Sequence, residues 1–168
     1  PRPRLQGTAR RAEINKNPPS SVYNWNRIVT QWNRPTISHE IGQWCAYPDF
    51  SEINRYTGPL KARNYEIYRD RLERNGLLPL AEKFKMASGK LQLLCYKAEV
   101  EAALRTCDLA GFQLLDLRDF PGQGTAPIGV LNTLWEEKGY ATAADYSRFC
   151  NAVVPLALFP KMIYENDE

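Results

Sequence analysis

The sequence PTISHEIGQW at residues 35–44 predicts a short buried strand that ends beside a carboxylate. Proline can begin a strand but cannot continue one, threonine and isoleucine favour extended backbone, and Gly42 lets the chain turn sharply. We therefore expect Glu40 at the point where the strand becomes a loop. In β/α barrels this end of the strand carries the chemistry, because strand ends and the loops after them build the active site.

Helical patterns separate this strand from a second one. Residues 61–75 predict a polar amphipathic helix followed by a helix-ending glycine, and residues 79–106 predict a further helix with a joint at Ser88-Gly89. The sequence GFQLLDL at residues 111–117 is the second buried-strand candidate. A strand, a long helical crossover and another strand are typical of a parallel β/α unit. The expected fold class is therefore α/β and rich in helix.

Shorter apolar patterns complete the expected elements. A short helix is predicted over residues 22–32, and another from an N-cap at Thr142 to about residue 152. On the second half of the long helix, the apolar residues expected to face a core are Leu91, Leu94, Tyr96, Ala98, Ala102 and Leu104. The aromatic residues of the first helix either pack as core or include one ring that serves as a sugar platform.

Length and charge are those of an ordinary globular unit. The chain has 168 residues, of which 43% are hydrophobic and 24% charged, and its net charge is +3. The basic cluster within residues 2–16 fits a solvated terminus better than a phosphate-binding surface, so we expect no nucleic-acid partner. No run approaches the roughly 20 apolar residues that span a bilayer, so we expect no membrane partner.

The two ends differ from the middle of the chain. The first residues, PRPR, carry no initiator methionine, apolar stretch or cleavage signature, which favours an internal cut in a longer polypeptide. The expected domains are an irregular segment over residues 1–21, a folded portion over 22–160 and an acidic tail over 161–168.

Metal and nucleotide chemistry have little support. The cysteines form no C-x-x-C pair, so buried free thiols are expected, with two disulfides as the alternative; they are Cys45, Cys95, Cys107 and Cys150. The single histidine, His39, lacks the second histidine of the zinc-protease motif, since Gln43 stands there. The sequence GQGT at residues 122–125 lacks the Gly-Lys-Ser/Thr ending of a phosphate loop. We expect no metal and no cofactor.

Carboxylates remain as the candidates for chemistry. Glycoside hydrolysis commonly uses two, one as acid and one as nucleophile about 5–5.5 Å away, or as base at greater separation. Glu40 is one candidate, and Asp116 and Asp119 lie at the end of the second strand candidate. Asp119 either lines the same cleft or holds a loop by accepting backbone N–H bonds. Arg118 can pair with Glu40 or Asp119, or clamp an anionic sugar.

Two neighbours of Glu40 have open roles. Consecutive strand residues point to opposite faces, so His39 and Glu40 are not expected to project into one site, and a structural role for His39 is favoured. Trp44 follows in an aromatic loop, where it either contacts a saccharide or packs the loop.

Two segments resemble a known family. The sequence TISHEIGQW at residues 36–44 resembles the segment around the nucleophile of glycoside hydrolase family 2 and related retaining β-glycosidases, and GFQLLDLRDF at 111–120 resembles their eighth strand. The two segments together also resemble β-galactosidase-like proteins of saccharide-degrading bacteria. The likeness covers roughly residues 22–160. No Asn-Glu dipeptide, which marks the acid/base of the family, occurs in the chain.

The resemblance implies that residues 22–160 form the C-terminal part of a (β/α)8 TIM-type barrel. It implies a retaining glycosidase in which Glu40 is the nucleophile and the acid/base lies outside this chain. The residues that would shape the sugar subsite are Trp44, Arg118, Asp119 and His39. The implied partners are an oligosaccharide or polysaccharide and the rest of the parent polypeptide, and the implied location is secreted or periplasmic. A non-catalytic carbohydrate-binding or scaffold domain is the alternative.

Overall fold

The computed structural model describes residues 20–121, 124 and 127–159. These residues form two compact units. The strand unit comprises residues 20–43, 94–115 and 143–159, and the loop unit comprises 44–93 and 116–142. Most of the predicted irregular segment 1–21, with its basic cluster, and the predicted acidic tail 161–168 lie outside the described residues.

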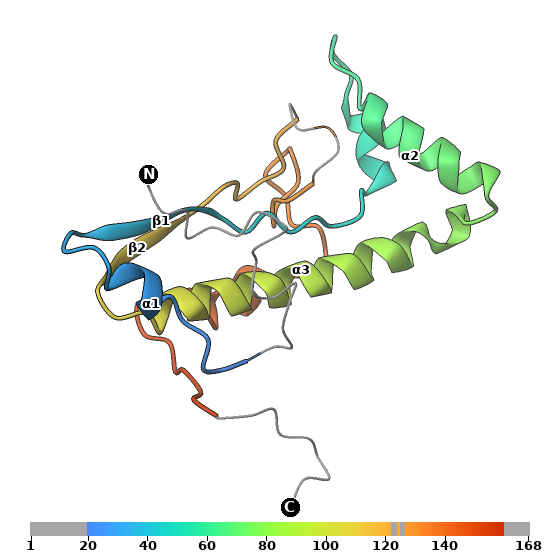
Figure 1. Cartoon of the computed structure of the whole chain (residues 1–168). Helices are drawn as coiled ribbons and strands as arrows, with labels where there is room; N and C mark the ends of the chain where they lie inside the picture. The colour runs from blue at the N-terminus through green and yellow to red at the C-terminus, as the bar shows by residue number, and fades with distance from the viewer. Residues whose placement is uncertain (1–19, 122–123, 125–126, 160–168) are drawn as a thin grey trace, which may run out of the picture. The chain divides into compact units, whose positions relative to one another are not determined.

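The strand unit contains the predicted parallel pair. Strand β1 (Thr36–Ile41) pairs in parallel with β2 (Leu109–Leu114), and the two lie side by side in Figure 1. Helix α3 (Ala81–Leu104) precedes β2 along the chain and forms most of the connection. The parallel β/α unit is therefore confirmed, with β2 beginning two residues earlier than predicted. These two strands form the one sheet among the described residues, and the complete barrel stays a prediction.

Strand β1 is only partly buried, which departs from the short buried strand that the sequence predicts. Ser38 and Ile41 are buried, whereas Ile37 is exposed. Glu40 is the penultimate residue of the strand and has a left-handed backbone with φ of 56°. The pairing with β2 is irregular between Ser38 and Ile41, because the left-handed residue interrupts the pleat there.

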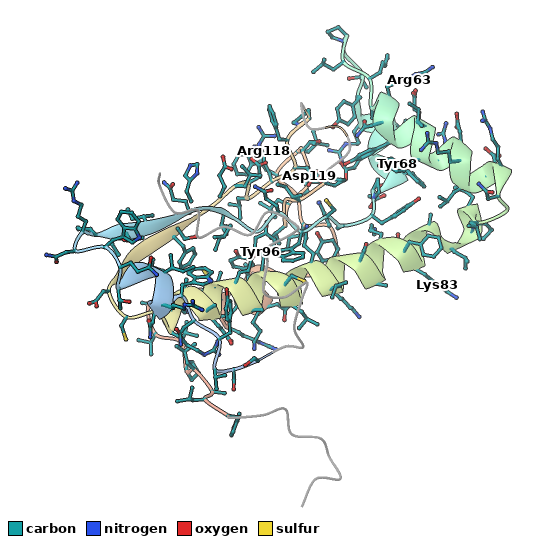
Figure 2. The ribbon with its side chains drawn as sticks, in the orientation of Figure 1. Arg63, Tyr68, Lys83, Tyr96, Arg118 and Asp119 are labelled. Carbon is teal, nitrogen blue, oxygen red and sulfur yellow. The ribbon has the colours of Figure 1, made fainter. Side chains whose placement is uncertain are left out.

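The turn predicted at Gly42 is present and has two causes. Its φ is 85°, which favours glycine, and a Cβ atom there would lie 2.0 Å from Cε1 of Tyr96. Figure 2 shows Tyr96 projecting from α3. The backbone N–H of Gly42 also donates to Oε2 of Glu99 over 2.9 Å. The end of β1 is therefore fixed against α3 by packing and by a hydrogen bond.

The short helices of the strand unit are shorter than predicted. Helix α1 spans Asn26–Val29, and α4 spans Ala143–Ser147, directly after the predicted N-cap at Thr142. Trp25 is buried and its backbone N–H donates to Oγ1 of Thr106 over 2.9 Å. This contact anchors the start of α1 to the segment that leads into β2.

Helix α2 (Arg63–Arg74) lies in the loop unit and ends as predicted. Gly76 has φ of 69°, its N–H donates to the carbonyl of Glu73 over 3.0 Å, and the N–H of Leu77 donates to the carbonyl of Leu72 over 2.9 Å. These two bonds form a Schellman motif, which satisfies carbonyls at the end of the helix. Two short 3-10 helices, η2 (Phe50–Arg55) and η3 (Leu78–Leu80), flank α2.

Helix α3 is continuous, so the predicted joint at Ser88-Gly89 is wrong. A Cβ atom at Gly89 would lie 2.2 Å from Cδ1 of Tyr140, and the glycine therefore makes room for that ring. Oγ of Ser88 donates to the carbonyl of Phe84 over 2.6 Å and accepts from the N–H of Tyr47 over 2.7 Å. Gly89 and Ser88 therefore allow other segments to pack against α3, and they do not interrupt the helix.

The prediction that Leu91, Leu94 and Leu104 face a core is also wrong, because Leu91 and Leu94 are each 61% exposed and Leu104 is 42% exposed. Tyr96 and Ala102 are buried as predicted. The apolar residues of helix α3 are not concentrated on one side, so periodicity did not distinguish its buried side. Among the described residues, no helix is long and apolar enough to cross a membrane.

Candidate functional site

The predicted site residues belong to different units. Glu40 and His39 lie in the strand unit, and Trp44, Arg118 and Asp119 lie in the loop unit.

Glu40 presents an accessible carboxylate. Its side chain is 42% exposed, and Oε1 lies 3.9 Å from Nδ1 of His39, whose side chain is largely exposed. Regular strand geometry predicts that the two side chains diverge, and this prediction is wrong because the left-handed backbone at Glu40 breaks the alternation. A left-handed residue other than glycine costs about 1–2 kcal/mol. Such strain is concentrated at functional sites, which makes Glu40 a candidate on geometric grounds.

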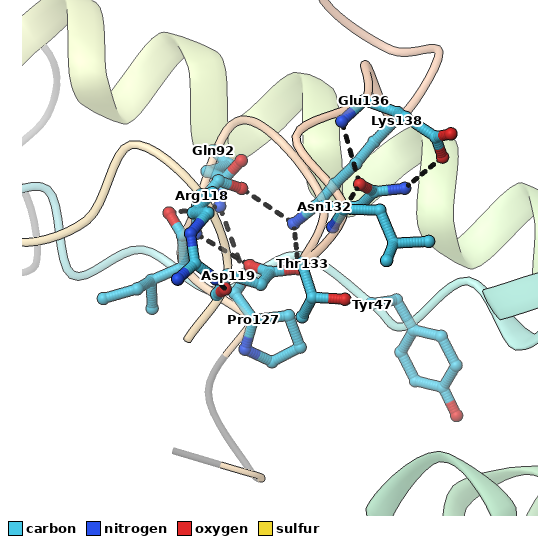
Figure 3. A network of polar contacts seen from close by, with 12 residues as sticks. Tyr47, Gln92, Arg118, Asp119, Pro127, Asn132, Thr133, Glu136 and Lys138 are labelled. Carbon is cyan, nitrogen blue, oxygen red and sulfur yellow. Dashed lines mark hydrogen bonds and ion pairs between the residues drawn. The ribbon is translucent and has the colours of Figure 1, made fainter. Parts of the chain in front are cut away.

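Unlike Glu40, Asp119 is buried and forms an ion pair. Its Oδ2 lies 2.7 Å from Nζ of Lys138, and both side chains are almost fully buried (Figure 3). Its Oδ1 accepts from the N–H of Gly129 over 2.8 Å, and Lys138 donates to the carbonyl of Gly129 over 2.7 Å. Burial raises the pKa of Asp119 and lowers the pKa of Lys138, while their mutual attraction opposes both shifts. Asp119 thus holds a loop, one of the two roles open for it.

Gly129 is required by this arrangement. A Cβ atom there would lie 2.1 Å from the carbonyl carbon of Arg118. The N–H of Asp119 donates to the carbonyl of Leu131 over 2.9 Å, and Leu131 in turn donates to the carbonyl of Leu117 over 3.0 Å. The two segments therefore approach closely and enclose the ion pair.

Gln92 connects α3 to the loops of this unit. Its amide nitrogen donates to the carbonyls of Trp44 over 2.6 Å and Ile128 over 3.1 Å, and its amide oxygen accepts from the hydroxyl of Tyr140 over 2.5 Å. The indole N–H of Trp44 is buried and has no hydrogen-bond partner among the described residues. The carbonyl of Trp44, which accepts from Gln92, helps to hold this loop against α3. A contact between Trp44 and a saccharide stays a prediction.

Glu52 is a second buried carboxyl group of the loop unit. It lies on η2, is 5% exposed, and its Oε2 has no hydrogen-bond partner among the described residues. Burial, followed by repulsion from Asp119, raises the pKa of Glu52 to about 7. This carboxyl group therefore exchanges a proton near neutral pH. The N-cap of η2, Asp49, is instead paired with Lys85 over 2.8 Å.

Arg118 lies over an aromatic ring. Its guanidinium carbon is 5.2 Å from the ring centroid of Trp135, and one of its N–H groups donates to the carbonyl of Asp119 over 3.1 Å. Trp135 is 62% exposed and has a left-handed backbone with φ of 68°. The predicted partner of Arg118 in this unit, the carboxylate of Asp119, instead pairs with Lys138.

The loop unit contains a pocket of about 70 Å³ at the start of α2. Tyr65 and Asp119 line it from the buried side, and Leu60, Lys61 and Phe120, which are exposed, also line it. Tyr56 and Thr133 also line the pocket, and their hydroxyl groups are hydrogen-bonded to each other over 2.7 Å. The pocket combines hydrogen-bonding groups with apolar surface.

Sequence reasoning missed Lys138, Gln92, Glu52 and Tyr65. No local signal distinguished them, since a lysine in a loop and a glutamine on a helix are usually exposed. The four cysteines, Cys45, Cys95, Cys107 and Cys150, are free as expected. The expectation that they are buried is wrong for Cys45 and Cys107, which are exposed. Among the described residues, no group of three or more His, Cys, Asp and Glu side chains is placed to hold a metal ion.

Comparisons with known proteins complete the description of the site. No protein-family model and no curated protein matches this chain.

Proposed function

We propose that this chain is the C-terminal part of a (β/α)8 glycoside hydrolase that cleaves a β-linked glycan with retention of configuration. Glu40 is the nucleophile. The observation that supports the proposal is an accessible carboxylate with strained backbone near the end of a strand that is paired in parallel with the next one. Barrel enzymes place their reacting groups at this end of parallel strands.

The proposed chemistry has two steps. A carboxylate oxygen of Glu40 attacks the anomeric carbon, the bond to the leaving oxygen breaks, and an acid outside this chain protonates the leaving group. Water then attacks the anomeric carbon of the glycosyl ester and gives a proton to the deprotonated acid. This step releases the sugar and restores both the carboxylate of Glu40 and the protonated acid. The exposure of the Glu40 side chain is compatible with an approaching sugar, and its position on a paired strand limits its movement.

A trapping reagent tests the role of Glu40 without the missing acid. A panel of 2-deoxy-2-fluoro-β-glycosyl fluorides is suitable because fluoride leaves without protonation. We expect intact-protein mass spectrometry to show one added glycosyl group, and peptide mapping to locate it on Glu40. Glu40→Gln should remain unlabelled. Glu73→Gln, which changes an exposed residue of α2, should be labelled like the unaltered protein. Labelling at another carboxylate, or none with any sugar, would contradict the proposal.

A non-catalytic saccharide-binding function is the second candidate, and Trp135 favours it. The ring is exposed and Arg118 lies over one of its faces, so the ring is held in place with apolar surface available. Such a ring suits the C–H face of a pyranose. In affinity gels containing a β-glucan or β-galactan, Trp135→Ala should lose retardation, while Trp32→Ala, which removes another exposed ring, should not. Equal retardation of all three proteins would exclude this role for Trp135.

A further inference from the structure

We propose that η2 is a pH-dependent switch of the loop unit. This helix stays packed while the carboxyl group of Glu52 is protonated and detaches locally when that group is ionised, which opens the pocket at the start of α2. The switch lies wholly in the loop unit and is independent of the function proposed for Glu40.

The packing of η2 depends on a carboxyl group. Among the six residues of this helix, Glu52 is the one that is buried, whereas Phe50 and Ile53 are only partly buried. Oε2 of Glu52 is buried and has no hydrogen-bond partner among the described residues. An ionised carboxyl group is far more costly to bury than a neutral one. The protonation of Glu52 therefore decides how firmly η2 is held.

The buried groups that face Glu52 supply one cation for two carboxyl groups. That cation is Lys138, and its Nζ lies 2.7 Å from Oδ2 of Asp119 (Figure 3). The other buried groups are Tyr65 of α2 and Tyr140, and burial raises the pKa of both hydroxyl groups, which therefore stay neutral. Burial, followed by repulsion from Asp119, raises the pKa of Glu52 to about 7. Once Glu52 is ionised, the cluster has two negative charges and one positive charge.

The charged groups at the two ends of η2 already have partners. The N-cap, Asp49, is paired with Lys85 over 2.8 Å, and the last residue, Arg55, is paired with Glu136 over 3.0 Å. Asp49 and Glu136 repel an ionised Glu52, and Arg55 attracts it. Because the pair of Arg55 and Glu136 is exposed to solvent, it holds the chain weakly. The C-terminal end of η2 can therefore detach while its N-cap stays in place.

Detachment of this end changes the pocket at the start of α2. Tyr56, the C-cap of η2, lines the pocket, and its hydroxyl group is hydrogen-bonded to that of Thr133 over 2.7 Å. The bond breaks when the C-terminal end of η2 moves away, and the pocket then opens on the side of Tyr56. The protonation of Glu52 thereby controls access to this pocket.

Amide hydrogen exchange of the full chain tests the switch. The N–H groups of Glu52 and Tyr56 donate to the carbonyls of Asp49 and Ile53 and therefore report on η2. The protection factor compares the observed exchange rate with the intrinsic rate at the same pH. We expect it to fall roughly tenfold for these two amides between pH 6 and pH 8, because the pKa of Glu52 is about 7 when η2 is packed and returns to its ordinary value of 4.5 when η2 is detached.

Two variants separate Glu52 from other effects of pH. In Glu52→Gln, which keeps the shape of the side chain without its charge, the protection factors of η2 should be equal at pH 6 and pH 8. Glu73→Gln, which changes an exposed residue of α2, should behave like the unaltered protein.

A denaturant shows whether the opening is local. The N–H of Leu131, which donates to the carbonyl of Leu117 over 3.0 Å, reports on the rest of the loop unit. Dilute guanidinium should accelerate the exchange of Leu131 and leave that of η2 nearly unchanged, because local detachment exposes little surface.

Three results would overturn the proposal. The first is an η2 whose protection factors are the same at pH 6 and pH 8 in the unaltered protein. The second is exchange of η2 that follows Leu131 in guanidinium, which indicates that the whole unit opens. The third concerns the carboxyl carbon of Glu52, whose chemical shift should titrate with a midpoint near 7 in the unaltered protein and not near 4.5. This last measurement keeps the test decisive if Glu52→Gln loses its fold.

Discussion

The carboxyl groups considered in the strand unit and in the loop unit differ in their exposure to solvent. In the strand unit, Glu40 is accessible to solvent and its strain lies in the backbone. In the loop unit, Asp119 and Glu52 are buried, the first beside Lys138 and the second with an unpaired oxygen. The carboxylate of Glu40 is therefore accessible, as the proposed function requires, whereas the buried carboxyl groups bear on the stability of their own unit. Changes to each group should therefore have different consequences.

The largest effect is expected from breaking the buried ion pair. Lys138→Met leaves the carboxylate of Asp119 buried without its cation, which should lower the free energy of unfolding by about 3–5 kcal/mol. Urea denaturation followed by tryptophan fluorescence measures this change. The surface pair of Arg55 and Glu136, 3.0 Å apart, provides the control, because Arg55→Gln breaks a solvent-exposed ion pair and should destabilise the protein far less. Equal effects of the two variants would show that the charge of Lys138 contributes little.

The turn at the end of β1 should give the next largest effect. Gly42→Ala adds a Cβ atom against the ring of Tyr96 and places alanine at a φ of 85°. The two penalties should together lower the free energy of unfolding by about 2–4 kcal/mol. Gly58→Ala is the control, since nothing lies within 4 Å of a Cβ atom there. A loss in Gly42→Ala no greater than in the control would mean that Tyr96 moves aside easily.

Glu52 should make stability depend on pH. Burial raises its pKa to about 7 in the folded chain, above the ordinary value of 4.5 that holds in the unfolded chain. The folded chain therefore binds more protons between these values, and stability falls as pH rises from about 4.5 to about 7. Between pH 5 and pH 8 this group should lower the free energy of unfolding by about 2–3 kcal/mol.

Comparison with Glu52→Gln isolates that contribution. The variant should lose this part of the pH dependence and be more stable than the unaltered protein at pH 8. Guanidinium denaturation at several pH values measures the difference between the two proteins. Parallel stability curves for the two proteins across this range would refute the assignment of the titration to Glu52.

The smallest effect is expected at Glu40 itself. Glu40→Gly relieves the left-handed backbone and should raise the free energy of unfolding by about 1 kcal/mol, while it removes covalent labelling by the fluoroglycosides. His39→Gly, at the preceding position of β1, where φ is not positive, should instead lower stability by roughly 0.5–1 kcal/mol. If Glu40→Gly were the more destabilised of the two, its backbone would carry no strain.

Local patterns in the sequence predicted much of the fold. The change from helical to strand periodicity predicted the parallel pair of β1 and β2, and the glycine after α2 predicted how that helix ends. Glycine at position 89 was misread as a joint because the sequence does not show that the ring of Tyr140 packs there. The exposed leucines of α3 were misread because a helix that is apolar on several sides does not reveal which side is covered.

The candidate site depended on more than local pattern. Glu40 was found from a strand followed by glycine, because backbone preference and strand ends are properties of a short segment. Lys138, Glu52 and Tyr65 were not found, because their roles arise where loops distant in sequence converge. By itself, therefore, the sequence determined the elements and the accessible carboxylate at the end of β1. Only the tertiary structure decided which charges are buried, because burial and pairing depend on neighbours from other parts of the chain.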